Sequence, residues 1–227
     1  MKSSPIYILV LAFFINSLSA QQIGSWRLHF KYNDSNDIAY SESKLISATD
    51  EALLVYFFDD GSIRELDKAK GLSDIGVSDI AYCKDEGTFI VAYNSTNIDL
   101  ISDNFSITNI PDIENKNTSV SKNINDIFIH NSKAFISSDL GLIILDIPNQ
   151  EIDNTYIIGN NGDPVPVVDC VVFNDTIYTV TNGQGIRYAP MEGVNLLDYT
   201  NWQVNQLGLP TNSFDFIEIF HFTSFSF

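Results

Sequence analysis

The side chains that most often carry out catalysis are scarce in this chain. It has 227 residues but only three histidines and two cysteines, and no histidine has a serine or cysteine at a spacing typical of nucleophilic catalysis. The segment after His130, Asn131-Ser132-Lys133, is typical of a turn, so this histidine is expected to border a turn and not to act as a base. The other two histidines are His29 and His221.

Carboxylates are abundant, and a pair of them could supply a general acid and a general base. Asp85-Glu86 and Asp59-Asp60 are each followed directly by glycine, which is typical of a solvated turn. Asp34-Ser35-Asn36-Asp37 resembles part of a calcium loop but lacks the glycine and the distal glutamate of a complete one. We therefore expect no enzymatic activity, no catalytic residue, no metal site and no cofactor, and no ligand-binding residue is identified. A glycosidase pair assembled from different repeats remains an alternative.

The elements that would position any functional residue are short strands. Residues 77–93 read as a strand, an acidic turn containing Gly87, and a second strand. Neither strand alternates strictly between apolar and polar residues, which predicts that both of its faces are covered. Because no amphipathic helix of ordinary length is visible, the covering elements are expected to be other sheets.

This unit recurs along the chain. Each copy opens with an aspartate followed by an apolar strand, and successive aspartates lie 42 to 47 residues apart. A second strand rich in small or hydroxyl residues, a third apolar strand and a looser fourth strand follow in each unit. Four short strands per unit of this length are typical of a β-propeller blade. The repeat aspartates are Asp37, Asp79, Asp126, Asp169 and Asp215.

The predicted fold is therefore all-β, a β-propeller built of four-stranded antiparallel blades. The propeller domain is expected over residues 21–227, and it is expected to be incomplete, with four blades and the start of a fifth. The expected blades are residues 37–76, 77–123, 124–166 and 167–210, with a partial blade at 211–227.

Residues 1–20 have the pattern of a secretory signal peptide. Lys2 precedes the apolar run Ile6–Ile15, which is too short to span a bilayer, and small residues lead to Ala20. An uncleaved anchor is the alternative. No second apolar stretch is long enough for a membrane helix, so the mature chain is expected to be exported without a transmembrane segment.

The composition favours a folded protein that does not bind nucleic acid. The chain has 29 acidic and 12 basic residues, a formal net charge of −17, and 44% hydrophobic residues. Such an excess of negative charge repels phosphate backbones, and the hydrophobic content is too high for a disordered chain.

The two cysteines, Cys83 and Cys170, are compatible with one disulfide in an exported protein. They lie four residues and one residue after their repeat aspartates, which places them on different faces of blades that are not adjacent. We therefore predict that both are buried free thiols.

Several segments together resemble a known family. Gly71-Leu72, followed by Val77 and Ile80, and Asp139-Leu140-Gly141-Leu142 resemble the propeller repeat of two-component regulators. Residues 26–33, 71–82 and 97–101 resemble more narrowly the PorZ-like propellers of the type IX secretion system. The resemblance covers roughly residues 24–219.

This resemblance implies a non-enzymatic scaffold or adaptor in an attachment complex at the cell surface or outer membrane, or in the periplasm. The implied partners are other secretion-system surface proteins, including a sortase-like protein to which anionic lipopolysaccharide is presented. The repeat alone also fits the extracellular ligand sensor of a hybrid two-component system, which would require a membrane helix and a kinase. A polysaccharide-active propeller enzyme is the third alternative.

Overall fold

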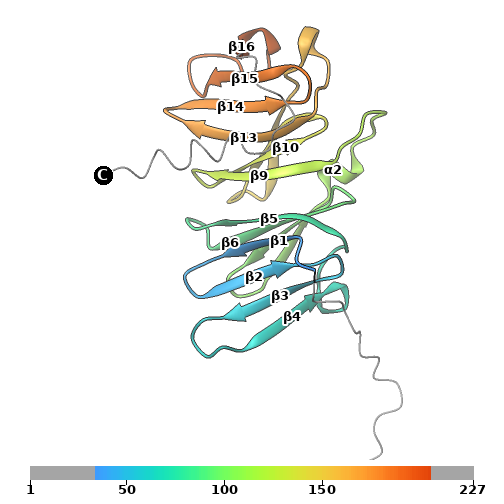
Figure 1. Cartoon of the computed structure of the whole chain (residues 1–227), viewed down its shortest axis with the longest axis vertical. Coiled ribbons are helices and arrows are strands. Elements are labelled where there is room, and N and C mark those ends of the chain that lie inside the picture. The colour runs from blue at the N-terminus through green and yellow to red at the C-terminus, as the bar shows by residue number, and fades with distance from the viewer. Residues whose placement is uncertain (1–33, 206–227) are drawn as a thin grey trace, which may run out of the picture. The chain divides into compact units, whose positions relative to one another are not determined.

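The computed structural model describes residues 34–205. The chain divides into two units, residues 1–30 and 31–227, and the described residues all belong to the second. Within them, sixteen strands form four sheets, each with four antiparallel strands in chain order (Figure 1). This architecture confirms the predicted fold class, a series of four-stranded propeller blades.

Each sheet is a meander in which strands that follow one another in sequence are hydrogen-bonded neighbours. The first sheet contains β1 (Asp37–Tyr40), β2 (Lys44–Ala48), β3 (Ala52–Phe57) and β4 (Ile63–Asp67). The second contains β5 (Val77–Cys83), β6 (Thr88–Tyr93), β7 (Ile98–Ser102) and β8 (Ile107–Ile110). The third contains β9 (Ile124–His130), β10 (Lys133–Ser138), β11 (Gly141–Asp146) and β12 (Glu151–Tyr156). The fourth contains β13 (Val167–Phe173), β14 (Thr176–Thr181), β15 (Gly185–Pro190) and β16 (Gln203–Asn205).

The described helices are short and lie in the connections. They are one α-helix, α2 (Asp112–Asn115), and three 3-10 turns, η2 (Lys68–Lys70), η3 (Asn160–Gly162) and η4 (Tyr199–Asn201). None of the described helices is long and apolar enough to cross a membrane.

Two glycines are required by the backbone around them. Gly87 has a φ of +57° in the turn between β5 and β6, as expected for the residue that closes the acidic hairpin. Gly141, at the start of β11, has a φ of +138°, and a Cβ added there would lie 2.3 Å from the carbonyl oxygen of Tyr156. The second position therefore excludes any side chain.

The hydrophobic core lies between consecutive sheets, because the middle strands are buried on both faces. Alternate residues of one strand enter different interfaces, so that Val91 of β6 packs toward the first sheet while Ile90 packs toward the third. The first interface includes Ile46, Val55, Phe89, Val91 and Ile101; the second includes Ile90, Leu100, Ile136, Ile143 and Leu145; the third includes Phe135, Ile144, Cys170, Ile177 and Trp202.

A buried carboxylate ties the second sheet to the connection that precedes it. Asp99 of β7 is fully buried and accepts hydrogen bonds from Ser73 N at 2.8 Å, Tyr93 Oη at 2.7 Å and Asn109 Nδ2 at 3.0 Å. Burial, together with the charge and the hydrogen bond of Asp99, raises the pKa of Tyr93, so this hydroxyl keeps its proton and donates it. The segment Gly71-Leu72-Ser73 is held in place by this network and by burial of Leu72.

We expect Tyr93→Phe to lower the free energy of unfolding by about 1.5–3 kcal/mol, because it removes a buried hydrogen bond to a charged acceptor. Urea denaturation would measure the loss. The matched control is Tyr40→Phe, at a tyrosine that is 70% exposed, and its effect should stay below about 0.5 kcal/mol. Equal midpoints for the two variants would show that the Asp99 network does not contribute to stability.

Candidate functional site

The first strands of the four sheets lie next to one another and bring the repeat aspartates into one row. β1 contacts β5, β5 contacts β9, and β9 contacts β13. Asp37 begins β1, whereas Asp79, Asp126 and Asp169 are each the third residue of their strand. The fifth repeat aspartate, Asp215, lies outside the described residues. Sequence spacing identified these residues but gave no sign that they contact one another.

A β-bulge precedes the aspartate in the later three sheets. The strand register shifts between Val77 and Asp79 in β5 and between Val167 and Asp169 in β13, and β9 shows the equivalent shift opposite Ser137 and Ser138. A bulge adds a residue on one strand and turns the next side chain to a new direction. The bulge is thus the local feature that aims each aspartate toward the neighbouring first strand.

The asparagine before the aspartate links the first sheet to the second and the third to the fourth. Asn36 Nδ2 donates to Asp50 Oδ1 at 2.7 Å and to the carbonyl oxygen of Val77 at 3.4 Å. In the third sheet, Asn125 Nδ2 donates in the same way to Asp139 and, at 2.7 Å, to the carbonyl oxygen of Val167. The segment considered as a calcium-loop fragment therefore holds two sheets together.

The aspartates interact in pairs across the sheet interfaces. Asp37 Oδ2 and Asp79 Oδ1 both accept from the backbone N–H of Ile80, at 3.0 and 2.9 Å. Asp37 Oδ1 also accepts from Ile38 N at 2.7 Å, so this carboxylate is an acceptor on both oxygens. The buried Oδ2 of Asp79 receives no donor from the protein. A proton on Asp79, donated to Asp37, gives both groups a partner.

Electrostatics support that arrangement. Burial, the hydrogen bond to Asp37, and the charges of Asp126 and Asp37 raise the pKa of Asp79 to about 9. Burial, followed by the charge and hydrogen bond of Asp169, raises the pKa of Asp126 to about 7. Asp79 therefore keeps its proton at neutral pH, whereas Asp126 binds its proton as the pH falls through about 7, because adjacent buried carboxyl groups do not readily both ionise.

The repeat aspartates stabilise the contacts between neighbouring sheets through hydrogen bonds and a bound proton. Among residues 34–205, no three His, Cys, Asp or Glu side chains gather closely enough to hold a metal ion. The hydroxyl of Ser137, directly opposite Asp126 in the sheet, and the buried thiol of Cys170 also lie near this row, and burial raises the pKa of that thiol.

We expect Asp79→Asn to weaken the dependence of stability on pH. A carboxyl group with a raised pKa in the folded state binds its proton more tightly there than in the unfolded chain. The stability it contributes is complete below the unfolded pKa of about 3.9 and is lost as pH rises through about 9. Asparagine is neutral and keeps a donor toward Asp37. Near pH 8 the variant should therefore have a free energy of unfolding about 1–2 kcal/mol higher than the wild type, after allowance for partial exposure, and should unfold at a higher temperature.

Thermal unfolding at about pH 5 and about pH 8 would measure this effect. Asp85→Asn, in the exposed turn between β5 and β6, is the matched control and should leave the pH slope unchanged. If Asp79→Asn and the wild type lost the same stability across this range, proton sharing at Asp79 would be excluded.

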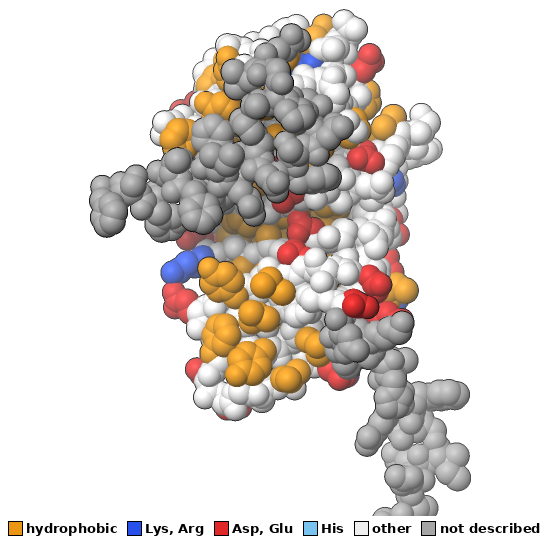
Figure 2. Space-filling view, in the orientation of Figure 1, with side chains coloured by type: hydrophobic (Ala, Val, Ile, Leu, Met, Phe, Trp, Pro, Cys, Tyr) orange, Lys and Arg blue, Asp and Glu red, His pale blue; other side chains and the backbone are white. Residues whose placement is uncertain are grey.

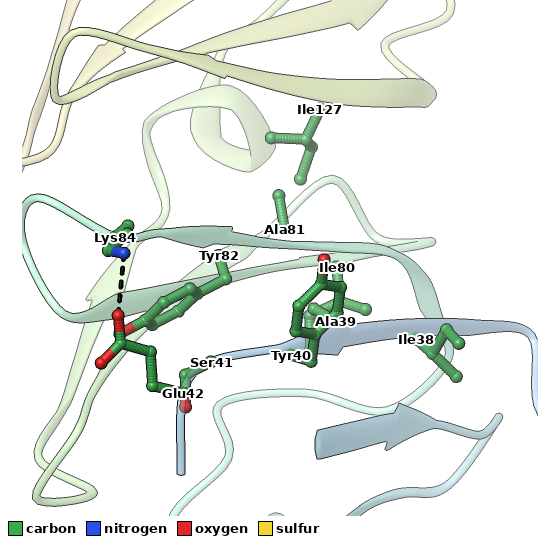
Figure 3. Close-up of a pocket in the computed structure, with 10 residues that line it drawn as sticks. All are labelled: Ile38, Ala39, Tyr40, Ser41, Glu42, Ile80, Ala81, Tyr82, Lys84 and Ile127. Carbon is green, nitrogen blue, oxygen red and sulfur yellow. Dashed lines mark ion pairs between the residues drawn. The ribbon is translucent and has the colours of Figure 1, made fainter. Parts of the chain in front are cut away.

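Beside this row lies a groove of about 760 Å³ between the first strands of the first three sheets (Figure 3). Lys84 and Glu42 form an ion pair of 2.8 Å at one end, and both side chains are highly exposed. Tyr82 donates weakly to Asp103, at 3.4 Å, from the same end. Most other lining groups are apolar: Ile38, Ala39, Ile80, Ala81 and Ile127, with Tyr40 and Ser41.

The remaining residues considered from sequence occupy structural positions. Asp60 Oδ1 accepts from Ser62 N at 2.9 Å within a turn. His130 ends β9 and contacts the amide of Asn131 at 3.0 Å, away from the groove lining. Cys83 and Cys170 are both free and buried, in different interfaces, and burial raises the pKa of each thiol.

Comparison with known proteins assigns this chain to a family. The model of the PorZ N-terminal β-propeller domain of the type IX secretion system matches residues 45–203. The chain belongs to this PorZ propeller family. The match begins within β2 and ends within β16, so it includes strands of all four sheets but not β1.

The solved structure of PorZ from Porphyromonas gingivalis is similar, with a TM-score of 0.73 and 25% sequence identity. The alignment covers 84% of this chain and 25% of that one, so this chain spans about a quarter of the PorZ length. That protein is described as an essential bacterial surface component of the type IX secretion system.

Two other solved structures share the fold alone. The extracellular domain of a putative hybrid two-component system from B. thetaiotaomicron has a TM-score of 0.58 and 13% identity, covering 78% of this chain and 23% of that one. AztD from Citrobacter koseri has a TM-score of 0.51 and 19% identity, covering 69% and 43%. No curated protein sequence matches this chain significantly.

Proposed function

We propose that this protein is a non-enzymatic scaffold or adaptor of the type IX secretion system. The observation that carries the proposal is the PorZ family match over residues 45–203, in agreement with the structural similarity to P. gingivalis PorZ. Since that relative is a surface component, we propose that this chain is exported after removal of residues 1–20 and acts at the cell surface.

The groove is consistent with a role in holding a protein partner. Its walls combine apolar and aromatic side chains with polar groups, and its one lysine, Lys84, is already paired with Glu42. Such a lining suits contact with another protein surface more than recognition of an anionic ligand. A sortase-like partner is the protein that the family resemblance suggests for this role.

Anionic lipopolysaccharide is the second component of the proposal, and it depends on the resemblance to PorZ-like proteins. Five lysines of the described chain already pair with carboxylates: Lys44, Lys68, Lys70, Lys84 and Lys133. The net charge of −17 opposes long-range attraction of a polyanion. Binding of lipopolysaccharide is therefore expected to depend strongly on salt and on few basic side chains.

An in-frame deletion of the gene tests the proposal in the bacterium that carries it. We expect cargo of the type IX system to be lost from the cell surface and recovered in the medium without attached lipopolysaccharide. Expression of the wild-type protein should restore attachment. Unchanged cargo attachment would contradict the scaffold role.

The same strain separates the two alternatives. A sensor of a hybrid two-component system would change transcription in response to a glycan while cargo attachment stayed normal. A polysaccharide-active enzyme would release reducing sugar when the purified protein is incubated with surface polysaccharide. We expect neither effect, because only the secretion-system assignment rests on the family match, whereas the sensor likeness at 13% identity concerns the fold.

A further inference from the structure

The fourth sheet buries a cation that has no carboxylate partner in the described chain. Arg187 of β15 is 3% exposed. It forms no ion pair within residues 34–205, whereas the other buried cation of that range, Lys44, pairs with Asp103 at 2.6 Å. Burial lowers the pKa of the Arg187 guanidinium, but an arginine side chain stays protonated at neutral pH. Because burial of a charge without an opposite charge is costly, this residue is a candidate for a binding role.

Arg187 lies between the third and fourth sheets. Residues two apart in a strand share a face, and Ala189 belongs to the core that these two sheets form together. The surroundings of Arg187 are therefore set by described strands and by the connection between β12 and β13.

The aligned residue of the second sheet is Asp99. Arg187 and Asp99 both lie two strands across from the residue that follows the repeat aspartate. Each side chain contacts the connection that precedes its own sheet, since Asp99 accepts from Ser73 N and Arg187 donates to Asn160 Oδ1. The Asp99 carboxylate is satisfied by three donors of the protein, whereas the charge of Arg187 is not balanced in this way.

The protein uses only part of the Arg187 guanidinium. This group donates hydrogen bonds from each of its nitrogens and accepts none. Nη2 donates to Asn160 Oδ1 at 2.5 Å and to Gln184 Oε1 at 2.8 Å. Nε is buried without a hydrogen-bond partner, and Nη1 donates to no residue that the structure describes. N–H groups on both of these nitrogens are therefore left without an acceptor.

The two amides add further donors. Because a guanidinium accepts no hydrogen bond, Asn160 and Gln184 must turn their oxygens toward it, which leaves their NH2 groups unused. Neither NH2 group donates within residues 34–205, and the backbone N–H of Asn160 fixes Gln184 by donating to Oε1 at 2.9 Å. The site thus presents unused donors, which suits a ligand group that only accepts.

The site lies just below the surface. Asn160, in η3, is exposed, and Gln184, in the turn between β14 and β15, is partly exposed. Gly183, beside Gln184, borders open space, because a Cβ added there would have no atom within 4 Å. Rotation of the two amide side chains is therefore enough to admit a small group to the guanidinium.

The charge of the site favours a carboxylate over other acceptors. The chain has a net charge of −17, and on the face shown in Figure 2 the Lys and Arg side chains form isolated patches. A phosphate dianion would bring more negative charge than one guanidinium neutralises, in a protein that already repels polyanions. A neutral hydroxyl would leave the buried charge unbalanced. A carboxylate carries one charge and matches the planar donor geometry of arginine.

We propose that Arg187, together with Asn160 and Gln184, binds a single carboxylate group of a ligand between the third and fourth sheets. The carboxylate accepts hydrogen bonds from the guanidinium and from an amide NH2 group, and it supplies the charge that the described chain lacks there. This proposal does not depend on the proposed secretion function.

Nuclear magnetic resonance of the arginine Nε–H groups, during titration of the purified protein with sodium acetate, tests the proposal. We expect the Arg187 signal, identified by its loss in Arg187→Lys, to shift saturably with a dissociation constant of about 1–10 mM. Sodium chloride at equal ionic strength should leave the signal in place. The matched control is Arg64→Lys, at the exposed arginine of β4, which should leave the Arg187 response intact.

The variant Arg187→Met separates a ligand site from a purely structural residue. It replaces an unpaired buried charge with an apolar side chain, so without acetate its unfolding midpoint in urea should be higher than that of the wild type. Acetate should raise the wild-type midpoint and leave that of the variant unchanged. Absence of any acetate effect on the wild type, or an equal effect on both proteins, would overturn the proposal.

The same titration with a uronic acid and with a short peptide ending in aspartate identifies the source of the carboxylate. Tighter binding of one of them than of acetate would assign the ligand to sugar acids or to polypeptides, and equal binding of all three would assign it to small free acids. A stronger response to inorganic phosphate than to acetate would contradict the assignment to a carboxylate.

Discussion

A sheet that is apolar on both faces needs a neighbour on each of them, and this requirement organises the described chain. Strands such as β6 and β10 are almost wholly buried along their length. Burial of apolar surface contributes roughly 25 cal/mol per Å² to the free energy of folding. An isolated four-stranded sheet of this kind would leave both apolar faces in water and lose most of that stabilisation. Stability therefore comes from the interfaces between sheets and not from any one sheet, as in other repeat proteins.

Polar groups make those interfaces specific. Asn36 and Asn125 donate hydrogen bonds to the next sheet, Asp99 holds the connection between the first two sheets, and neighbouring aspartates along the first strands raise the pKa values of Asp79 and Asp126 beyond the effect of burial. The asparagine contacts recur in the first and third sheets and the aspartates recur in all four, whereas the Asp99 network belongs to the second sheet alone among the described sheets, where Leu54 and Ile143 take the aligned positions in the first and third. The groove beside the aspartate row then remains as a surface for binding, and it is lined by apolar, aromatic and charged side chains.

The fold could be predicted because it follows from local periodicity. Spacing of the repeat aspartates and strands without polar alternation gave four-stranded blades, and Cys83 and Cys170 could be placed on different faces from their offsets. The interaction between Asp37 and Asp79 could not be predicted from the sequence, because it depends on a bulge at Ser78 and on how two sheets pack against each other. The only sequence signal was that each repeat has an acid at the same place.

The exposure of one face of the first sheet could not be predicted, for a related reason. Ile38 and Tyr40 occupy the same positions in the repeat as Ile80 and Tyr82, in identical Asp-Ile-Ala-Tyr segments. The same residues therefore occur in a sheet whose face is covered by a neighbour and in one whose face is exposed. Only the exposure of each residue in the fold separates them. The family assignment could be anticipated from residues 71–82 and 97–101 because these encode the connection and strands that the PorZ propeller model also describes.

Hydrogen exchange of backbone amides, followed by mass spectrometry on the wild-type protein, tests most directly whether contacts between sheets hold the molecule together. The account predicts that β6, β7, β10 and β11, in the two sheets covered on both faces, exchange slowest and lose protection together in denaturant. β2 and β3, in the first sheet, which exposes Ile38, Tyr56 and Ile63 on one face, should exchange faster. If β2 and β3 were protected as strongly as β6 and β10, and each sheet lost protection independently, single sheets would be the stable units and the account would be contradicted.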